Sequence, residues 1–268
     1  MLKVGLVGCG VIGSGLARAI DSRKVPGLEL VAICDKDKIK GDKLASSLRN
    51  KPVVTTIDGV IEKAHLIIEA ASSDMVGQLA QKVLHKNKDI MVMSVGGMLD
   101  YFQLFSEARE KKCKIYFPSG AIAGLDGIKA AKEAGLDSVT LQTSKPPQGL
   151  KGAPYLLEKN IDLRGIKEKV VVFEGNCQEA VKAFPKNINV AAALSFAGIG
   201  MERTKVRIIA DPSLKRNVHH IVATGDFGKL EINIENVPSP SNPKTSYLAI
   251  LSAIATLRGI VDSVKIGS

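Results

Sequence analysis

A glycine-rich segment near the start of the chain has the spacing of a phosphate-binding turn. The segment Gly8-Cys9-Gly10-Val11-Ile12-Gly13 follows the apolar run Leu2–Val7. In such a turn the first glycine allows a tight bend, the second lets the backbone approach a pyrophosphate, and the third lets helix and strand pack closely. The phosphate then lies at a helix N-terminus, where free N–H groups favour an anion. We therefore predict dinucleotide contacts at Gly8, Gly10, Val11, Ile12 and Gly13.

An aspartate downstream supports the same interpretation. Asp35 ends the second apolar run, Leu28–Cys34, and lies 22 residues after Gly13. A carboxylate at this place can accept hydrogen bonds from both hydroxyls of an adenosine ribose. It would repel a 2′-phosphate and so favours NAD, but Lys36 and Lys38 lie close enough to weaken that preference. The cofactor is therefore NAD or NADP.

Small residues end the next two apolar runs of the chain. They are Ala70-Ala71-Ser72-Ser73 and Ser94-Val95-Gly96-Gly97. Because the strand ends of such a sheet line the cofactor crevice, we expect Ala71, Ser72 and Ser94 to lie near the nicotinamide half. Ordinary turn chemistry, with Ser72 or Ser73 capping a helix, is the alternative, and the two interpretations are compatible.

The four histidines differ in their surroundings. His65 and His85 have polar neighbours and are predicted to be exposed. His219 and His220 are adjacent on a predicted strand, so their side chains point to opposite faces and only one can serve a given cleft. By itself this pattern favours a half-buried, hydrogen-bonded imidazole over a catalytic one.

The elements that position these residues alternate in the first part of the chain. Strands are expected at Leu2–Val7, Leu28–Cys34, Leu66–Ala70, Asp89–Ser94 and Lys114–Phe117. Helices are expected between them, at Gly13–Ile20, Lys40–Leu48, Met75–Leu84 and Tyr101–Lys112. Apolar strands separated by helices indicate a parallel sheet covered on both faces. The fold class is therefore α/β, with a doubly wound, Rossmann-type dinucleotide-binding domain.

The pattern changes after residue 120, where strands follow one another more closely. We expect strands at Ser138–Thr143, Lys169–Phe173, Lys205–Ala210, Asn217–Thr224 and Lys229–Glu235. Residues 229–235 alternate strictly between polar and apolar, as in a half-exposed antiparallel strand. Residues 123–244 are thus predicted to form an α+β substrate and dimerisation domain with a mostly antiparallel sheet, whose exposed face suggests a homodimer. Residues 1–122 and 245–268, including a final apolar helix at Ser246–Ile260, form the dinucleotide-binding domain.

Composition excludes several classes of protein. The chain has 268 residues, 45% of them apolar, and a net charge of +10, which is typical of a globular protein. Its longest uncharged stretch, Asn187–Met201, is too short to span a membrane, and its N-terminus enters a strand at once, so we predict a cytoplasmic protein. The charge alone fits a nucleic-acid partner or a small anionic substrate equally well. Because the lysines are scattered and there is no Trp to stack on bases, we predict no nucleic-acid partner.

The cysteines give no sign of a metal site. Cys9, Cys34, Cys113 and Cys177 match neither a zinc spacing nor a redox pair, so we expect reduced thiols and no metal. Neither Cys113 nor Cys177 has a nucleophile context beside a histidine, which disfavours an aldehyde dehydrogenase with a cysteine nucleophile.

Four blocks of sequence carry a more specific resemblance. They are Pro118-Ser119-Gly120-Ala121-Ile122-Ala123-Gly124-Leu125-Asp126-Gly127, Phe184-Pro185-Lys186-Asn187-Ile188-Asn189-Val190-Ala191, Asn217-Val218-His219-His220-Ile221 and Asn242-Pro243-Lys244-Thr245-Ser246. In this order, and over almost the whole chain, they resemble the L-aspartate dehydrogenase family, which is similar in fold to homoserine dehydrogenases and dihydrodipicolinate reductases.

The resemblance implies an activity and site residues. The family's cofactor-contacting alanine and asparagine fall on Ala123 and Asn189, and its active-site histidine falls on His219. The implied reaction is metal-free oxidative deamination of L-aspartate to oxaloacetate through iminoaspartate, which would supply NAD biosynthesis. The family's Arg-Lys-Pro-Pro-like stretch is Ser144-Lys145-Pro146-Pro147 here, with Ser144 where an arginine is frequent, so the carboxylate clamp departs from the pattern.

The chemistry of that reaction agrees with these assignments. Imine formation and hydrolysis need a group that titrates near neutrality, and His219 is the candidate. The two carboxylates of aspartate call for cationic donors in a closed cleft between domains, with Lys145 the first candidate and Arg164 the second. Asn217, in the block of His219, is assigned to the substrate. Asn187 is expected to cap the helix Val190–Ile199, and Asn189 to contact the cofactor.

Two other functions remain as alternatives. A sibling oxidoreductase of the homoserine dehydrogenase or dihydrodipicolinate reductase type would share the glycine turn, but the chain lacks recognisable substrate motifs of those enzymes. A non-catalytic, NAD-binding redox sensor acting on DNA would need a helix-turn-helix or a clustered basic face, and the sequence shows neither.

Overall fold

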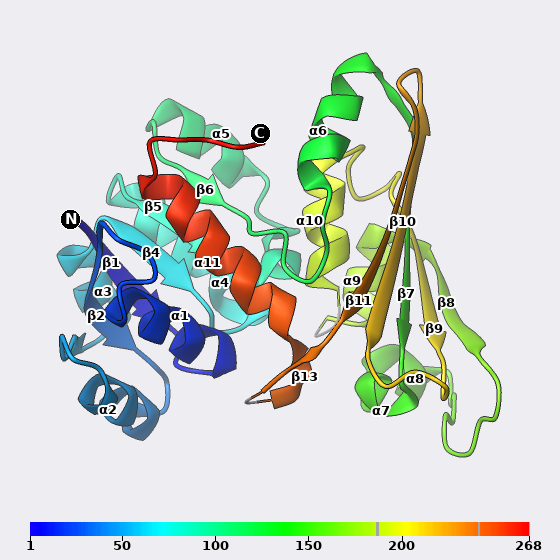
Figure 1. Cartoon of the computed structure of the whole chain (residues 1–268), viewed down its shortest axis with the longest axis horizontal. Helices are drawn as coiled ribbons and strands as arrows, with labels where there is room; N and C mark the ends of the chain where they lie inside the picture. The colour runs from blue at the N-terminus through cyan, green and yellow to red at the C-terminus, as the bar shows by residue number, and fades with distance from the viewer. Residues whose placement is uncertain (186–187, 241, 268) are drawn as a thin grey trace. The chain divides into compact units, whose positions relative to one another are not determined.

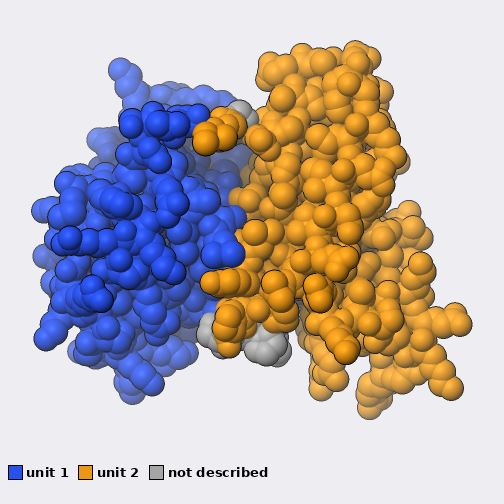
Figure 2. Space-filling view, viewed as in Figure 1, with its two compact units in different colours: residues 1–118, 250–265 blue, residues 119–249, 266–268 orange. Residues whose placement is uncertain are grey.

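The chain divides into two compact units. The computed structural model describes residues 1–185, 188–240 and 242–267. Unit 1 comprises Met1–Pro118 and Ile250–Lys265, and unit 2 comprises Ser119–Ala249 with the last residues of the chain (Figure 2). Each unit has its own sheet.

Unit 1 is built on a parallel sheet of six strands (Figure 1). In spatial order these are β3 (Val53–Val54), β2 (Leu28–Cys34), β1 (Leu2–Val7), β4 (Leu66–Glu69), β5 (Asp89–Val92) and β6 (Ile115–Tyr116). The chain runs outward in one direction from β1 and in the other from β4, so the order reverses between these two strands. Parallel sheets bind dinucleotides at the carboxyl ends of the strands beside such a reversal. The predicted doubly wound fold is confirmed.

Helices cover both faces of this sheet. They are α1 (Val11–Asp21), α2 (Lys38–Ser47), α3 (Ile57–Lys63), α4 (Ser73–His85), a 3₁₀ turn η1 (Val95–Met98), α5 (Gln103–Glu110) and α11 (Tyr247–Val261). On one face Leu16 and Ile20, a helical turn apart on α1, pack with Leu6 of β1 and with Ala253 and Leu257 of α11. Burial of each leucine contributes about 2 kcal/mol. The C-terminal helix therefore completes the core of unit 1.

Unit 2 contains a mixed sheet of five strands. Their order is β11 (Gly228–Asn236), β10 (Asn217–Gly225), β7 (Leu136–Lys145), β9 (Lys205–Ala210) and β8 (Val170–Asn176). Only the β7–β9 pair is parallel in this sheet, and the other neighbours are antiparallel. The expected α+β domain with a mostly antiparallel sheet is confirmed.

The sheet of unit 2 has one buried and one open face. Along β7 the side chains of Val139, Leu141, Thr143 and Lys145 are buried, whereas those between them are only half-buried. The helices of this unit are α6 (Leu125–Ala134), α7 (Pro147–Leu150), α8 (Pro154–Glu158), α9 (Cys177–Ala183) and α10 (Asn189–Ala197), and a small ribbon pairs β12 (Pro238–Ser239) with β13 (Asn242–Ser246). Helices α6 and α10 lie against one face of the sheet (Figure 1). Thr143 and Lys145 are polar side chains on this buried face, and they are therefore candidates for a functional role.

Some elements were not predicted from the sequence. The strand β3 has two residues, and the helices α3 and α9 have seven each, too few for a clear periodic pattern. Among the residues that the structure describes, no helix is long and apolar enough to cross a membrane, and no three His, Cys, Asp or Glu side chains gather to hold a metal ion.

Candidate active site

The glycine turn of unit 1 has the geometry of a phosphate cradle. Gly8 has a φ of +100°, and a Cβ there would overlap the Ala70 backbone. A Cβ on Gly13 would overlap the Gly8 carbonyl, so this glycine permits the close packing of α1 on the turn. At Gly10 a Cβ would meet no atom within 4 Å, which leaves the backbone open to approach. Gly10 is also the N-cap of α1, and no side chain caps the helix, so its first N–H groups suit a pyrophosphate.

Asp35 joins this turn to the end of β2. Its Oδ2 accepts a hydrogen bond from the Cys9 backbone N–H at 2.6 Å, and its Oδ1 accepts one from the Asp37 N–H at 2.8 Å. These bonds fix the orientation of the carboxylate, while each oxygen keeps a second acceptor site for a ribose hydroxyl. Lys36 and Lys38 are exposed.

A buried glutamate that sequence reasoning missed organises the next two strand ends. Glu69 ends β4 and is fully buried. It accepts hydrogen bonds from the backbone N–H groups of Ala71, Met93 and Ser94, at 2.8, 3.2 and 2.9 Å, and from the Ser94 hydroxyl at 2.9 Å. Burial raises the pKa of Glu69, whereas these hydrogen bonds oppose the shift. An acidic residue at the end of an apolar strand was the available signal.

Ala71, Ser72 and Ser94, which were predicted to lie near the cofactor, follow the two strand ends that Glu69 connects. The Ser94 hydroxyl donates its proton to Glu69, so it can only accept from a ligand. Ala71 and Ser72 are exposed. Ser72 is the N-cap of α4, one of the two predicted cap positions, but its side chain makes no cap hydrogen bond. Ser73 is the first residue of the helix, so the capping interpretation is wrong for Ser73.

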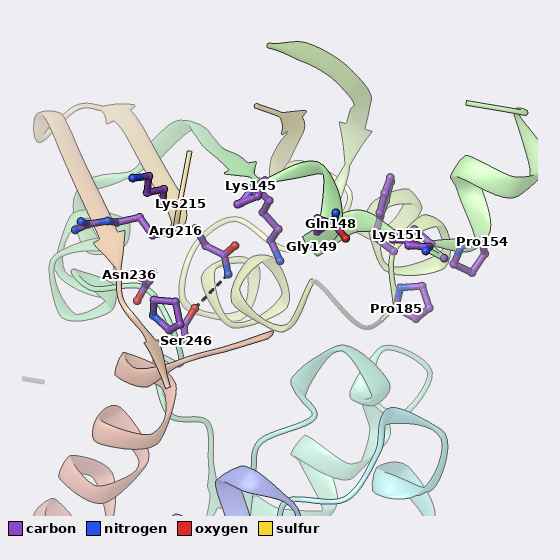
Figure 3. Close-up of a pocket in the computed structure, with 16 residues that line it drawn as sticks. Lys145, Gln148, Gly149, Lys151, Pro154, Pro185, Lys215, Arg216, Asn236 and Ser246 are labelled. Atoms are coloured by element: carbon purple, nitrogen blue, oxygen red, sulfur yellow. Dashed lines mark hydrogen bonds between the residues drawn. The ribbon is translucent and has the colours of Figure 1, made fainter. Parts of the chain in front are cut away.

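Unit 2 contains a pocket of about 900 Å³ with a strongly cationic lining. Its charged lining residues are Lys145, Lys151, Lys215 and Arg216. No aspartate or glutamate is among the described residues that line it. Figure 3 shows Lys145 extending into the pocket, with Lys215 and Arg216 to one side and Lys151 to the other. Such a lining favours a small molecule with more than one negative charge.

Strand register places the polar lining residues in one row. Asn217 of β10 lies opposite Asn236 of β11. On the other side of β10, Val218 pairs with Ser144 of β7, and Lys145 is the next residue of β7. Asn217 Nδ2 also donates to Ser246 Oγ at 3.4 Å, the hydrogen bond drawn in Figure 3. Residues of four strands, β7, β10, β11 and β13, therefore meet at this end of the sheet.

His219 lies one row further along the same buried face. It is 2% exposed, stands opposite Thr143, and its Nδ1 shares a hydrogen bond of 3.0 Å with the Thr143 hydroxyl. Burial, and next the positive charge of Lys145, lowers the pKa of His219 to about 3. The imidazole is therefore neutral at pH 7 and able to accept a proton. It is not among the residues that line the pocket.

Lys145 and His220 complete the electrostatic description. Lys145 is buried, and burial lowers its pKa to about 8. His220 points to the other face of the sheet, where its Nε2 lies 2.9 Å from Glu231. The prediction that the two histidines face opposite sides is confirmed.

Comparison with known proteins decides the family. Residues 126–260 match the family model "Aspartate dehydrogenase, C-terminal", and residues 8–118 match "Homoserine dehydrogenase, NAD binding domain". The L-aspartate dehydrogenases of Methanosarcina acetivorans and Nitrosopumilus maritimus are 52% and 44% identical to the chain, with both proteins covered in full. The chain belongs to the L-aspartate dehydrogenase family.

Solved structures agree with this assignment. The crystal structure of aspartate dehydrogenase from Thermotoga maritima is 28% identical over the whole of both chains, with a TM-score of 0.76. The scyllo-inositol dehydrogenase of Lactobacillus casei, solved with bound NAD(H) and scyllo-inositol, is 15% identical, covers 100% of this chain and 91% of its own, and has a TM-score of 0.57. The latter shows a likeness of fold alone.

The remaining residues assigned from the aspartate dehydrogenase family lie in unit 2. Ala123 is exposed beside Gly124, the N-cap of α6, and Asn189 is the first residue of α10, after the N-cap Ile188. Asn187 lies outside the described residues. Ser144, where the family often has arginine, is half-buried and does not line the pocket. Arg164 is bound to Asp162 at 2.8 Å and is also absent from the pocket lining, so it is no clamp for a ligand there.

The cysteines of this dehydrogenase are poor nucleophiles. None of the four is paired in a disulfide. Burial raises the pKa of Cys9 to about 12 and that of Cys177 to about 11, and it also raises the pKa of Cys34 and Cys113. A thiol with a raised pKa holds little thiolate near neutral pH, which argues against cysteine chemistry.

Proposed function

We propose that the chain oxidises L-aspartate to iminoaspartate with NAD or NADP, and that iminoaspartate is hydrolysed to oxaloacetate and ammonia. The observation that carries this proposal is the pocket of unit 2, where several cations and no described acidic side chain adjoin a neutral, buried histidine. A dicarboxylic acid matches these charges. Family membership supports the same substrate.

The residues of unit 1 suit the dinucleotide. Gly8, Gly10, Val11, Ile12 and Gly13 would hold the pyrophosphate, and Asp35 the adenosine ribose. Ala71, Ser72 and Ser94 of unit 1, and Ala123 and Asn189 of unit 2, would contact the nicotinamide half. A bound nicotinamide would supply the acceptor for the hydride that leaves Cα of the substrate. The carboxylate of Asp35 favours NAD because it would repel the 2′-phosphate of NADP. The exposed lysines Lys36 and Lys38 would attract that phosphate and so weaken the preference.

The residues of unit 2 would bind the substrate and move protons. Lys145 and Asn217, which both line the pocket, would hold carboxylate oxygens of the substrate. Neutral His219 accepts the proton that leaves the substrate ammonium and releases it to solvent after hydride transfer. It then accepts the proton of the water that adds to the imine carbon and returns this proton to the departing ammonia. Thr143 holds the ring through Nδ1, which leaves Nε2 as the second ring nitrogen for this work.

A kinetic screen tests the proposed reaction. Purified protein is assayed with L-aspartate, homoserine and dihydrodipicolinate against NAD, NADP or their reduced forms, by nicotinamide absorbance. We expect turnover with L-aspartate. Activity only with the other two substrates would favour a sibling enzyme, and absence of turnover with salt-sensitive DNA binding would favour a redox sensor.

Substitution of the histidine tests the mechanism. His219→Ala should lower kcat by roughly 100-fold or more and leave dinucleotide affinity little changed, because a proton acceptor contributes about 10²–10⁴-fold to rate. His220→Ala, on the opposite face of the sheet, is the matched control and should retain activity. Equal activity of both variants would remove His219 from the mechanism.

Two further properties belong to the same proposal. Released iminoaspartate would feed NAD biosynthesis, and unchanged labelling of quinolinate from aspartate in a deletion strain would contradict this.

The protein would also be a homodimer joined through the open face of the unit 2 sheet, where Thr140, Gln142, His220 and Val222 are only half-buried.

A further inference from the structure

Asn236 carries a buried oxygen that has no hydrogen-bond partner among the described residues. This last residue of β11 is 3% exposed and lines the pocket of unit 2. Its Nδ2 donates to the Ala121 carbonyl at 2.9 Å, but its Oδ1 accepts from no group of the described chain. A buried acceptor without a donor costs about 1–3 kcal/mol, and such atoms are rare in folded proteins.

The orientation of this amide is determined by its neighbour. A carbonyl oxygen such as that of Ala121 can only accept a hydrogen bond, so the NH₂ of Asn236 must face it. The amide oxygen then has to point the other way. Exchanging the two ends would leave the Ala121 carbonyl without its donor and set two oxygens against each other. The unsatisfied acceptor therefore follows from the structure and is not a matter of amide assignment.

The rest of the pocket defines what can supply the missing donor. Asn217, directly across the strand pair, and Ser246 already bond to each other. Lys145, Lys151, Lys215 and Arg216 attract anionic groups. In Figure 3 Asn236 lies beside Ser246, away from Lys151 and Pro154. A ligand that satisfies the whole pocket thus needs negative charges for the cations and an N–H donor for Asn236.

We infer that Asn236 Oδ1 accepts a hydrogen bond from the amino group of a bound amino dicarboxylic acid. Asn236 is then the residue that distinguishes such a ligand from a dicarboxylic acid of the same length without an amino group. A charge-assisted bond of this kind also offsets the repulsion between a substrate ammonium and the surrounding lysines. The inference rests on the proposed function and names the group of the chain that recognises the amine.

Binding of two ligands that differ only in the amine tests this role. Affinities for L-aspartate and succinate are measured by calorimetry on protein saturated with NADH, in which neither ligand turns over. Asn236→Leu, similar in size, should weaken L-aspartate binding about tenfold or more and change succinate binding by less than about twofold. Asn233→Leu is the matched control, because Asn233 is an exposed residue of the same strand, and should change neither affinity.

A second variant keeps the test sharp if Asn236→Leu folds poorly. Asn236→Asp loses the donor to Ala121, as Asn236→Leu does, but it retains an acceptor and adds a negative charge. It should therefore raise the ratio of L-aspartate to succinate affinity, the opposite direction to Asn236→Leu. A merely structural role, through the bond to Ala121, would weaken both ligands equally. Equal weakening, or an unchanged ratio in both variants, would overturn the inference.

The same measurements separate this inference from the proposed reaction. Should the wild-type protein bind L-aspartate without oxidising it, the proposed function fails, while the affinity ratio still reports on Asn236. Should it oxidise L-aspartate with an affinity ratio that Asn236→Leu leaves unchanged, the inference alone fails. Absence of binding of either ligand to the wild type would overturn both.

Discussion

At the scale of single residues, surroundings decide the chemistry of identical side chains. His219 and His220 are neighbours, yet one is buried beside Thr143 and the other reaches Glu231 on the opposite face. The cause is the alternation of side chains along a strand. Because Lys145 lies on the buried face, its charge acts on His219, and each of the two groups has a lowered pKa.

The pKa of His219 is open to direct measurement. A histidine in an unfolded chain has a pKa of about 6.5, whereas the pKa of His219 in the folded chain is about 3. Between these two pH values only the unfolded state binds the proton. Stability therefore falls as the pH drops through this window. Lys145→Met removes one cause of the shift, and we expect the pKa of His219 to rise but to stay below the unfolded value, because burial is the larger cause.

Histidine titration by NMR checks this expectation. Lys151→Met is the control, since it removes the same charge from an exposed position and should leave the pKa of His219 nearly unchanged. A wild-type His219 that titrates between pH 6 and 7 would contradict the description of a buried, neutral imidazole.

At the scale of elements, the first strand, turn and helix form one mechanical unit. Gly13 lets α1 lie against the turn, whereas Gly10 faces open space. The two glycines are therefore expected to fail in different ways when substituted. Gly13→Ala forces a Cβ into the Gly8 carbonyl and should cost about 2 kcal/mol or more of stability.

Gly10→Ala should affect binding more than stability. An alanine at this N-cap costs about 0.5–1 kcal/mol relative to glycine, and its methyl group occupies the approach side of the pyrophosphate. We expect NADH affinity to fall about tenfold or more, with a loss of thermal stability smaller than that of Gly13→Ala. Fluorescence titration and thermal unfolding measure the two effects. Gly259→Ala, which meets no neighbour within 4 Å on α11, is the control for the added methyl group.

Prediction of the elements succeeded for the strands of the two large sheets other than β3, but it missed the ten-residue helix α6. β1, β2 and β9 have the expected bounds, and α11 begins one residue later than expected. β3 was missed because two valines between polar loops carry no period; they become a strand only by pairing with Ala32 and Ile33 of β2. Such short elements depend on tertiary pairing more than on their own sequence.

At the scale of the whole molecule, the open face of the unit 2 sheet gives a prediction about assembly. Valine side chains on this face, including Val222, lie among polar neighbours and are half-buried in the single chain. We expect sedimentation to give the mass of two chains. Val222→Asp should shift the mass toward one chain, because burial of an unpaired carboxylate in an interface is unfavourable. Thr256→Asp, on α11 in unit 1, is the control, and a wild-type monomer would contradict the proposed homodimer.

The proposed dinucleotide-binding turn could be predicted from the sequence because its residues lie close together along the chain. A strand, three glycines, a helix and an acidic residue follow one another within 35 residues, and the conformation that each requires depends on near neighbours. The proposed substrate pocket could be predicted only in part. His219 and Lys145 could be assigned from resemblance, but the lowered pKa of each arises from burial, which no local pattern reports.

Tertiary structure decided which distant residues act together. Glu69 receives its hydrogen bonds from the ends of two strands, and Lys145, Asn217 and Asn236 meet only because β7, β10 and β11 pair in one register. A shift of one residue in that register would turn every one of these side chains to the other face. Composition and spacing predicted a dinucleotide-binding unit; long-range strand pairing and burial decided the shape, charge and unsatisfied acceptor of the pocket in unit 2.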